Sequence, residues 1–156
     1  MKWQDVLEHP SLQDLPFKIE MNEWGQIVMS PASNKHGFYQ GELTSGLKQA
    51  LPAGRVITEC SIDTPKGTKV ADVAWASNAF IERYGYETPY PRAPEICVEI
   101  LSPSNTTAEM KEKIMLYLAK GAQEVWMCDL EGRLTFHGNE GELESSNLTP
   151  HFSSQI

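Results

Sequence analysis

The sequence predicts an α/β fold, of the mixed-sheet α+β kind, in which a central sheet of four or more strands is flanked by helices. Short β-branched and apolar runs alternate with two long segments of helical composition, near residues 35–50 and 106–120. Two further runs near the N-terminus, separated by a turn that contains glycine, predict an added β-hairpin. The chain has 156 residues, which suits a single domain over residues 1–156 with one core.

Turn residues separate the predicted strands. The N-terminal hairpin is expected to pair Phe17–Met21 with Gln26–Met29 across a turn that contains Gly25. Residues 1–15 precede it as a short helical or irregular lead. Residues 77–94, rich in Tyr and Pro, lack periodicity and are expected either as a packed connector or as a lid or partner surface. Five later runs are expected as strands, at residues 55–62, 69–75, 95–101, 124–129 and 134–136.

The two long helices are predicted from their ends. Ser, Pro and Asn at residues 30–34 supply caps for the helix near 35–50. The apolar side of this helix is expected to carry Phe38, Leu43 and Leu47. The helix near 106–120 begins after a Thr or Asn cap and closes at Gly121.

The formal net charge of −8 limits how the chain can bind nucleic acid, because basic side chains that neutralise phosphate supply most non-specific affinity. The acidic excess lies mainly near the C-terminus, where residues 121–156 carry six acids and only Arg133 as a base. Residues 137–156 are expected as an acidic C-terminal tail. Any binding of DNA should be weak in isolation and should depend on divalent metal and low salt.

Cysteine usage and the N-terminus indicate the compartment. The first ten residues lack the apolar core of a signal peptide, and no run of about 18 apolar residues occurs. A soluble cytoplasmic protein with no membrane partner is therefore expected. Cys60, Cys97 and Cys128 lie in apolar contexts without CxxC spacing, so reduced core thiols are expected rather than a zinc site or a disulfide.

Two predicted strands each carry one acid among apolar residues. Asp72 lies in the run Val70–Trp75, and Glu99 lies near the end of Glu95–Leu101, which Ser102-Pro103 stops. An unpaired carboxylate in such a strand would be costly or would shift its pKa upward, so a partner such as a lysine or a metal ion is implied. The alternative for each acid is a strand end at which the carboxylate meets water or a backbone amide.

The helix that follows Glu99 can return basic residues to the same strand. Asp, Glu and Lys together are typical of metal-dependent phosphodiesterases. Two carboxylates hold Mg²⁺ or Mn²⁺ through oxygen, and the lysine positions the attacking water or stabilises charge on the phosphate. This helix offers Lys111 and Lys113 on opposite flanks of its apolar stripe, and spacing alone does not choose between them.

Several short blocks of the chain match one family pattern. The most specific is Glu99-x-x-Ser102-Pro103-Ser104 followed by Glu112-Lys113-x-x-x-Tyr117. Further blocks are Pro31 with His36, Ala71-Asp72-Val73, and Gly121-Ala122-Gln123-Glu124-Val125-Trp126 leading to Asp129. Over about residues 17–136, the expected endonuclease-like core, the chain resembles the Uma-type family of the PD-(D/E)XK nuclease superfamily, whose members are described as restriction endonucleases.

By position, the resemblance makes Asp72 and Glu99 the metal-binding acids and Lys113 the catalytic lysine. The lysine usually lies two residues after the second acid in the superfamily, where this chain has Leu101. The resemblance therefore implies that the lysine has moved onto the helix. Ala71 stands where the family usually has Pro, which should be harmless because this residue does not coordinate.

The resemblance implies a restriction-endonuclease-like core and Mg²⁺-dependent hydrolysis of DNA phosphodiester bonds by metal-activated water. Two residues of the first helix are further candidates. His36 could position water or contact phosphate, with a local hydrogen bond as the alternative, and Glu42 could supply an extra carboxylate. A catalytically silent nucleic-acid-binding or protein-assembly module on the same fold, such as a homodimer that holds a partner through residues 77–94, is the other function, and the acidic charge favours it.

Overall fold

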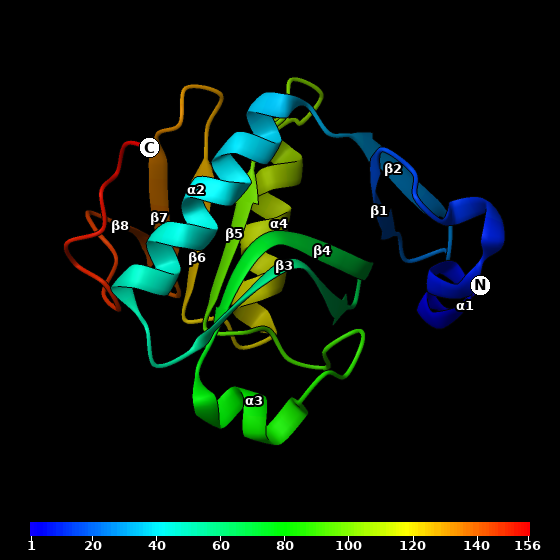
Figure 1. The fold of residues 1–156 in the computed structure, drawn as a ribbon, viewed down its shortest axis with the longest axis horizontal. Coiled ribbons are helices and arrows are strands. Elements are labelled where there is room, and N and C mark those ends of the chain that lie inside the picture. The colour runs from blue at the N-terminus through cyan, green and yellow to red at the C-terminus, as the bar shows by residue number, and fades with distance from the viewer.

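The computed structural model describes residues 1–156 and contains two β-sheets, of six and two strands (Figure 1). Its elements in chain order are α1 (Trp3–Glu8), the 3₁₀ turn η1 (Pro10–Leu12), β1 (Phe17–Met21), β2 (Ile27–Pro31), α2 (Asn34–Ala50), β3 (Arg55–Thr64), β4 (Gly67–Ala76), α3 (Asn78–Tyr84), β5 (Ile96–Ile100), α4 (Thr107–Ala119), β6 (Glu124–Cys128), β7 (Leu134–Gly138) and β8 (Gly141–Leu143).

The six-stranded sheet has the order β3-β4-β5-β6-β7-β8, and its strands are antiparallel except for the parallel pair β5 and β6. Helix α4 makes the crossover between these two parallel strands. Alternate strand residues face opposite sides, so Leu43 of α2 packs with Val98 on one face, whereas Tyr117 of α4 packs with Cys97 on the other. The prediction of a mixed sheet flanked by two helices is confirmed.

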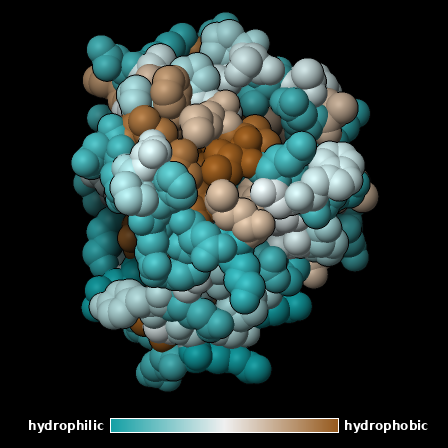
Figure 2. Space-filling view, turned by 90° about the vertical axis from the view of Figure 1, so that its right-hand side faces the viewer, coloured by the Kyte–Doolittle hydropathy of each residue, from teal (hydrophilic) through white to brown (hydrophobic).

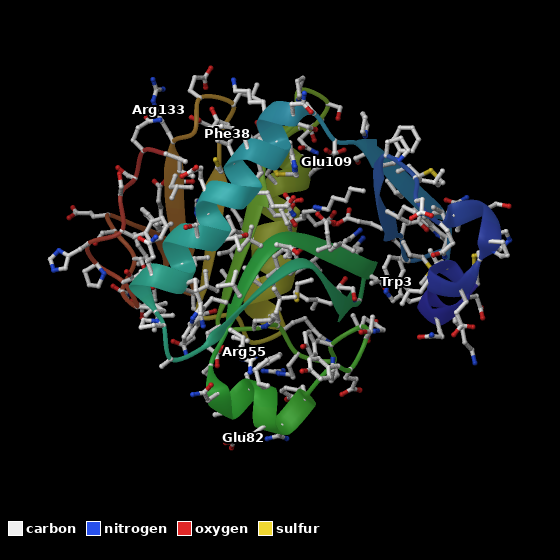
Figure 3. The ribbon with its side chains drawn as sticks, in the orientation of Figure 1. Trp3, Phe38, Arg55, Glu82, Glu109 and Arg133 are labelled. Carbon is white, nitrogen blue, oxygen red and sulfur yellow. The ribbon has the colours of Figure 1, made fainter.

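Both long helices begin at side-chain caps. The Ser33 hydroxyl accepts a hydrogen bond from the His36 N–H at the start of α2. At the start of α4, Thr106 and Glu109 form a capping box, in which each side chain accepts from the other residue's backbone N–H. Leu43 and Leu47 are buried as predicted, but Phe38, labelled in Figure 3, is 68 % exposed, so its placement on the buried apolar side of α2 was wrong.

The hairpin β1–β2 and helix α1 form a small unit beside the larger sheet, on the right in Figure 1. Ile19 on one face of β1 packs with Trp3 of α1, labelled in Figure 3, and with Val70 of β4. Figure 2 looks onto this side of the molecule and shows hydrophobic residues gathered among polar ones. Because side chains alternate along a strand, Lys18 and Glu20 lie on the opposite face of β1.

The turn between β3 and β4 lies directly against the hairpin. Gly67 in this turn has a φ of 89°, and a Cβ atom there would overlap the backbone of Met21 and Asn22. The Val70 N–H, just beyond the turn, donates a hydrogen bond to Glu20 Oε1 at 2.8 Å. These contacts fix the hairpin against β4 and determine where Lys18 and Glu20 point.

Residues 137–156 belong to the folded unit, which differs from the expected acidic tail. The segment includes β8, which pairs with β7. Ser146 and Thr149 are buried, and Phe152 packs against Trp126 with their ring centroids 4.8 Å apart. The acids of this segment suggested a solvated tail, but the apolar residues between them cover the α2 side of the sheet.

The Tyr-rich residues 77–94 are largely a packed connector. They contain α3, and Phe80 of this helix meets Tyr90 edge to face at 5.0 Å between ring centroids. Both rings are buried, whereas Tyr86 is exposed. The three cysteines are free and buried, as expected. None of the helices combines the length and the apolar character that crossing a bilayer requires.

Candidate active site

Asp72 is a fully buried carboxylate in the middle of β4. The pairing of β3 with β4 skips Asp72 and Glu59, which stands opposite it in the left-handed region with a φ of 53°. The register is the same on both sides of this pair, so the ladder is interrupted at Asp72 without an inserted residue. Its carbonyl oxygen accepts from Gln40 Nε2 at 2.8 Å, and its Oδ2 accepts from the Ile100 N–H at 2.7 Å. The second carboxylate oxygen, Oδ1, remains for the site.

Glu99 is the second buried acid and lies on the neighbouring strand β5. The Tyr117 hydroxyl donates a hydrogen bond to Glu99 Oε1 at 2.7 Å. The other oxygen, Oε2, contacts two ammonium groups, Lys18 Nζ at 3.1 Å and Lys113 Nζ at 3.2 Å. Lys113 and Tyr117 lie one turn apart on α4, so the crossover helix supplies both contacts to the face of β5 that carries Glu99.

Lys18 of the hairpin lies between the two acids. Its Nζ is 3.0 Å from Asp72 Oδ1 and 3.1 Å from Glu99 Oε2, and its side chain is only 12 % exposed. Lys18 is not among the site residues predicted from the sequence. Strict alternation along the predicted strand, which puts Lys18 and Glu20 together on the face opposite Ile19, is the signal that could have found it.

Glu20 is the other site residue that the sequence alone did not predict. Its Oε1 accepts from Lys113 Nζ at 2.8 Å and lies 3.9 Å from Lys18 Nζ. Glu20 therefore connects the hairpin to α4 as well as to β4. Of the two candidate lysines on α4, Lys113 reaches the carboxylates, whereas Lys111 is exposed and forms no ion pair.

Of the two candidates on α2, the structure brings His36 to the site and leaves Glu42 apart. His36 Nε2 lies 3.3 Å from Asp72 Oδ1, and its side chain is 13 % exposed. Glu42 is exposed and lines a separate cavity beside Phe152. The helical twist accounts for this difference, because six residues along a helix rotate a side chain to another face.

Burial and neighbouring charges shift the pKa values of the site in opposite directions. Burial raises the pKa of Glu99 above its ordinary 4.5, and the charges of Lys113 and Lys18 offset this only in part. Burial acts upward on Asp72 too, but the charge of Lys18 and the hydrogen bond with His36 bring its pKa well below 3.8. Burial would lower the pKa of Lys18, yet the charges of Glu99 and Asp72 raise it well above 10.5.

The donor atoms at this centre fit a divalent metal ion. No three side chains of the His, Cys, Asp and Glu types come together in ligating geometry. Two carboxylate oxygens do converge, since Asp72 Oδ1 and Glu99 Oε2 share their contact with Lys18 Nζ. Mg²⁺ is commonly held by one or two carboxylates while it keeps several waters. Asp72 and Glu99 are therefore the residues that would hold such an ion.

A cleft of about 170 Å³ opens beside Glu99, between the hairpin and the start of α4. Glu109, labelled in Figure 3, stands at the α4 edge of this cleft. The lining includes Lys18, His36, Lys69, Ser102, Asn105 and Lys113. The lining also includes the acids Glu20, Glu99, Glu109 and Glu112, so the cleft carries charges of both signs.

One solved structure that covers nearly the whole chain agrees with this fold. The structure is similar to "a putative nuclease belonging to DUF820 from Anabaena variabilis ATCC 29413", with a TM-score of 0.70, 19 % sequence identity, and coverage of 92 % of this chain and 90 % of that chain. A chain of a DrdV–DNA complex solved by cryo-electron microscopy is also similar, with a TM-score of 0.46 and 14 % identity over 69 % of this chain and 9 % of that chain. No curated protein matches the sequence.

A family model, Uma2, matches residues 3–152 and carries the description "Putative restriction endonuclease". The match covers nearly the whole chain and so includes both elements that build the site and those outside residues 17–136. It confirms the resemblance inferred from the short sequence blocks, and the solved nuclease confirms the fold. The chain belongs to the Uma2 family.

Proposed function

We propose that this protein is a DNA endonuclease that depends on Mg²⁺ or Mn²⁺ and hydrolyses phosphodiester bonds by attack of an activated water. The observation that carries the proposal is the convergence of Asp72 Oδ1 and Glu99 Oε2 on one cation position, with Lys113 Nζ 3.2 Å from the same Glu99 oxygen. The family match supports a nuclease, and DNA is the substrate expected of a restriction endonuclease.

Different residues of the site would bind the metal ion, stabilise charge on the phosphate and position the acids. Asp72 and Glu99 would hold the metal ion, which supplies Lewis acidity and a water that ionises near neutral pH. Lys113 lies beside the carboxylates on the cleft side, where its charge stabilises the negative charge that develops on the phosphate. The Ile100 N–H and the Tyr117 hydroxyl hold Asp72 and Glu99 in place through the carboxylate oxygens that do not face Lys18.

The charge of the chain shapes how DNA would bind. A formal net charge of −8 opposes a polyanion, so cations in the cleft and a bound metal ion have to supply the local attraction. The affinity for DNA should therefore be low without metal, and binding should be detectable only at low salt. The low affinity follows from the small number of lysines at the site, which neutralise few phosphates.

Cleavage of plasmid or branched DNA by purified protein tests the proposal. Nicking or cutting is expected with Mg²⁺ or Mn²⁺ at low salt, and none with Glu99→Ala from a parallel preparation. Equal cleavage by both proteins would point to a contaminating nuclease. Absence of cleavage across plasmid, linear, single-stranded and branched substrates would instead favour the silent binding module.

One observation favours that silent module as the second candidate function. Lys18 already satisfies both carboxylates, so the site is neutralised without any metal ion. Calorimetric titration with Mn²⁺ separates the two functions. An endonuclease should bind one or two ions and lose this binding in Asp72→Ala, whereas a silent module should give no heat of binding in either protein.

A further inference from the structure

Lys18 holds the position that a metal ion would need. Its ammonium contacts Asp72 Oδ1 at 3.0 Å and Glu99 Oε2 at 3.1 Å. A Mg²⁺ ion bound to the same two oxygens would lie about 2.1 Å from each of them. Two cations cannot share that space, and their mutual repulsion in a largely buried site would be strong. Binding of a metal ion at the two acids therefore requires Lys18 to leave them.

We propose that Lys18 is an exchangeable internal cation, which holds Asp72 and Glu99 together without metal and withdraws when a divalent ion binds. Lys18 thereby sets the affinity of the site for metal. This inference rests on the divalent-ion site of the proposed function and goes beyond it, because it assigns a competing role to a hairpin residue. It also explains how two acids on adjacent strands stay close before any metal arrives.

Glu20 offers the Lys18 ammonium another acidic partner, although its Oε1 also accepts from Lys113 Nζ and the Val70 N–H. Glu20 Oε1 lies 3.9 Å from Lys18 Nζ, and the two residues share one face of β1. The lysine side chain has a flexible stem of four carbons, so rotation about its bonds can shift the ammonium toward Glu20 without movement of the strand. Lys18 also lines the cleft, which leaves open space on its free side. Exchange therefore needs a change in one side chain rather than a displaced hairpin.

The competition predicts opposite effects for two substitutions at one position. Lys18→Met keeps the aliphatic stem and removes the charge, so Mn²⁺ meets no competitor at the carboxylates. Lys18→Arg keeps the charge and adds a planar pair of donors suited to bridging carboxylates, so it should be harder to displace. The expected order of Mn²⁺ affinity is Lys18→Met above wild type, and wild type above Lys18→Arg.

Isothermal titration with Mn²⁺ at low ionic strength measures this order. Each step is expected to be about tenfold or more, the scale of losing or strengthening one close charge pair in a partly buried site. Lys69→Met is the matched control, because Lys69 lines the same cleft but forms no ion pair with either acid. It removes the same charge from the protein, so its Mn²⁺ affinity should stay within about twofold of wild type.

Thermal unfolding gives a readout that is independent of activity. Without metal, Lys18→Met should melt below wild type because two buried carboxylates lose a shared cation, and Mn²⁺ should raise its midpoint by more than it raises that of wild type. If Lys18→Met does not fold without metal, the Lys18→Arg arm still measures the competition.

The outcomes separate the exchange from the proposed function. Suppose that wild type binds Mn²⁺. If Lys18→Met then binds Mn²⁺ no more tightly than wild type, or if Lys18→Arg binds it no more weakly, the exchange is overturned and the metal site is kept. Equal gains in Lys18→Met and Lys69→Met would also overturn it, since net charge would then explain the result. Absence of Mn²⁺ binding in every variant would overturn the exchange together with the metal site.

Discussion

Glu99 and Glu124 are two buried carboxylates on the adjacent parallel strands β5 and β6, and they are satisfied in different ways. Glu124 accepts four hydrogen bonds, and all four donors are neutral: Trp126 Nε1 at 2.9 Å, Ser146 Oγ at 2.7 Å, the Asn147 N–H at 2.6 Å and the Leu148 N–H at 3.0 Å. Glu99 has one neutral donor, Tyr117, and two ammonium groups.

This difference indicates which acid holds the fold together and which can exchange its partners. The donors of Glu124 are fixed by the backbone or by packing, so nothing there can leave without unfolding the C-terminal segment. The ammonium groups at Glu99 stand at the ends of flexible stems and face a cleft. Burial of an acid is therefore not by itself a sign of function; the mobility of its partners is the distinguishing feature.

The largest expected effect comes from Glu99→Gln. This change removes one of the two charged oxygens that would hold the metal ion, so cleavage should fall by about 1,000-fold or more. Glutamine keeps the size of the side chain, and the protein should remain folded by circular dichroism. Plasmid nicking under single-turnover conditions measures the loss, and near-normal rates in Glu99→Gln would remove Glu99 from the active site.

Lys113→Ala should lower cleavage by at least ~100-fold, the scale for losing a positioned charge-stabilising or proton-transfer group. Lys111→Ala, two residues away on the exposed side of α4, is the matched control and should change the rate little. A comparable loss in both variants would mean that the overall charge of α4 matters rather than the contact between Lys113 and Glu99.

Glu124→Gln should leave the cleavage rate per folded molecule unchanged and should instead lower stability. With the Gln amide nitrogen on the side of Trp126 and Ser146, the Ser146 hydroxyl can turn to accept from it, but the buried Trp126 N–H loses its acceptor. The free energy of unfolding should fall by about 2–3 kcal/mol. Urea denaturation measures this cost, and an unchanged midpoint would show that the C-terminal segment is held by its apolar contacts alone.

The smallest effect concerns His36 and pH. Its hydrogen bond with Asp72 raises the pKa of His36 above its ordinary 6.5. The contact therefore stabilises the fold fully below pH 6.5, and this contribution is lost as pH rises through the raised pKa. Asp72 stays ionised across this range because its own pKa is lowered.

His36→Asn tests that sign by urea denaturation at about pH 6 and pH 9. The free energy of unfolding of wild type should exceed that of the variant at the lower pH, and this difference should shrink by up to about 1 kcal/mol at the higher pH. A difference between the two proteins that does not change with pH would show that the charge of His36 plays no part in the contact.

Most of the fold and the two acids of the site were predicted from short-range features of the sequence. The helix caps at Ser33 and Thr106 are short-range signals, and the two helices that follow them form where they were predicted. Asp72 and Glu99 stood out because an acid in an apolar strand is unusual at any position. Sequence spacing left Lys111 and Lys113 equal, and the choice of Lys113 came from the family pattern.

The missed features depend on tertiary contacts that no local pattern encodes. Lys18 and Glu20 look like ordinary polar positions of a half-exposed hairpin, and only the docking of the hairpin on β4 brings them to the acids. The segment 137–156 was expected to be solvated because its charge is evident in the sequence. The sequence does not reveal the four hydrogen bonds that Glu124 accepts, two of which come from the backbone of that segment.

The site joins residues that are far apart along the chain. Lys18 and Glu99 are separated by 81 positions, and Glu20 and Lys113 by 93. Closing loops of this size is slow compared with forming a helix or a hairpin, because the entropy of the intervening chain has to be given up first. During synthesis from the N-terminus, the hairpin residues emerge long before their partners on β5 and α4. The nascent chain therefore lacks the Lys113 and Tyr117 contacts to Glu99 until α4 has been made, so the candidate active site is among the last parts of the molecule to be completed.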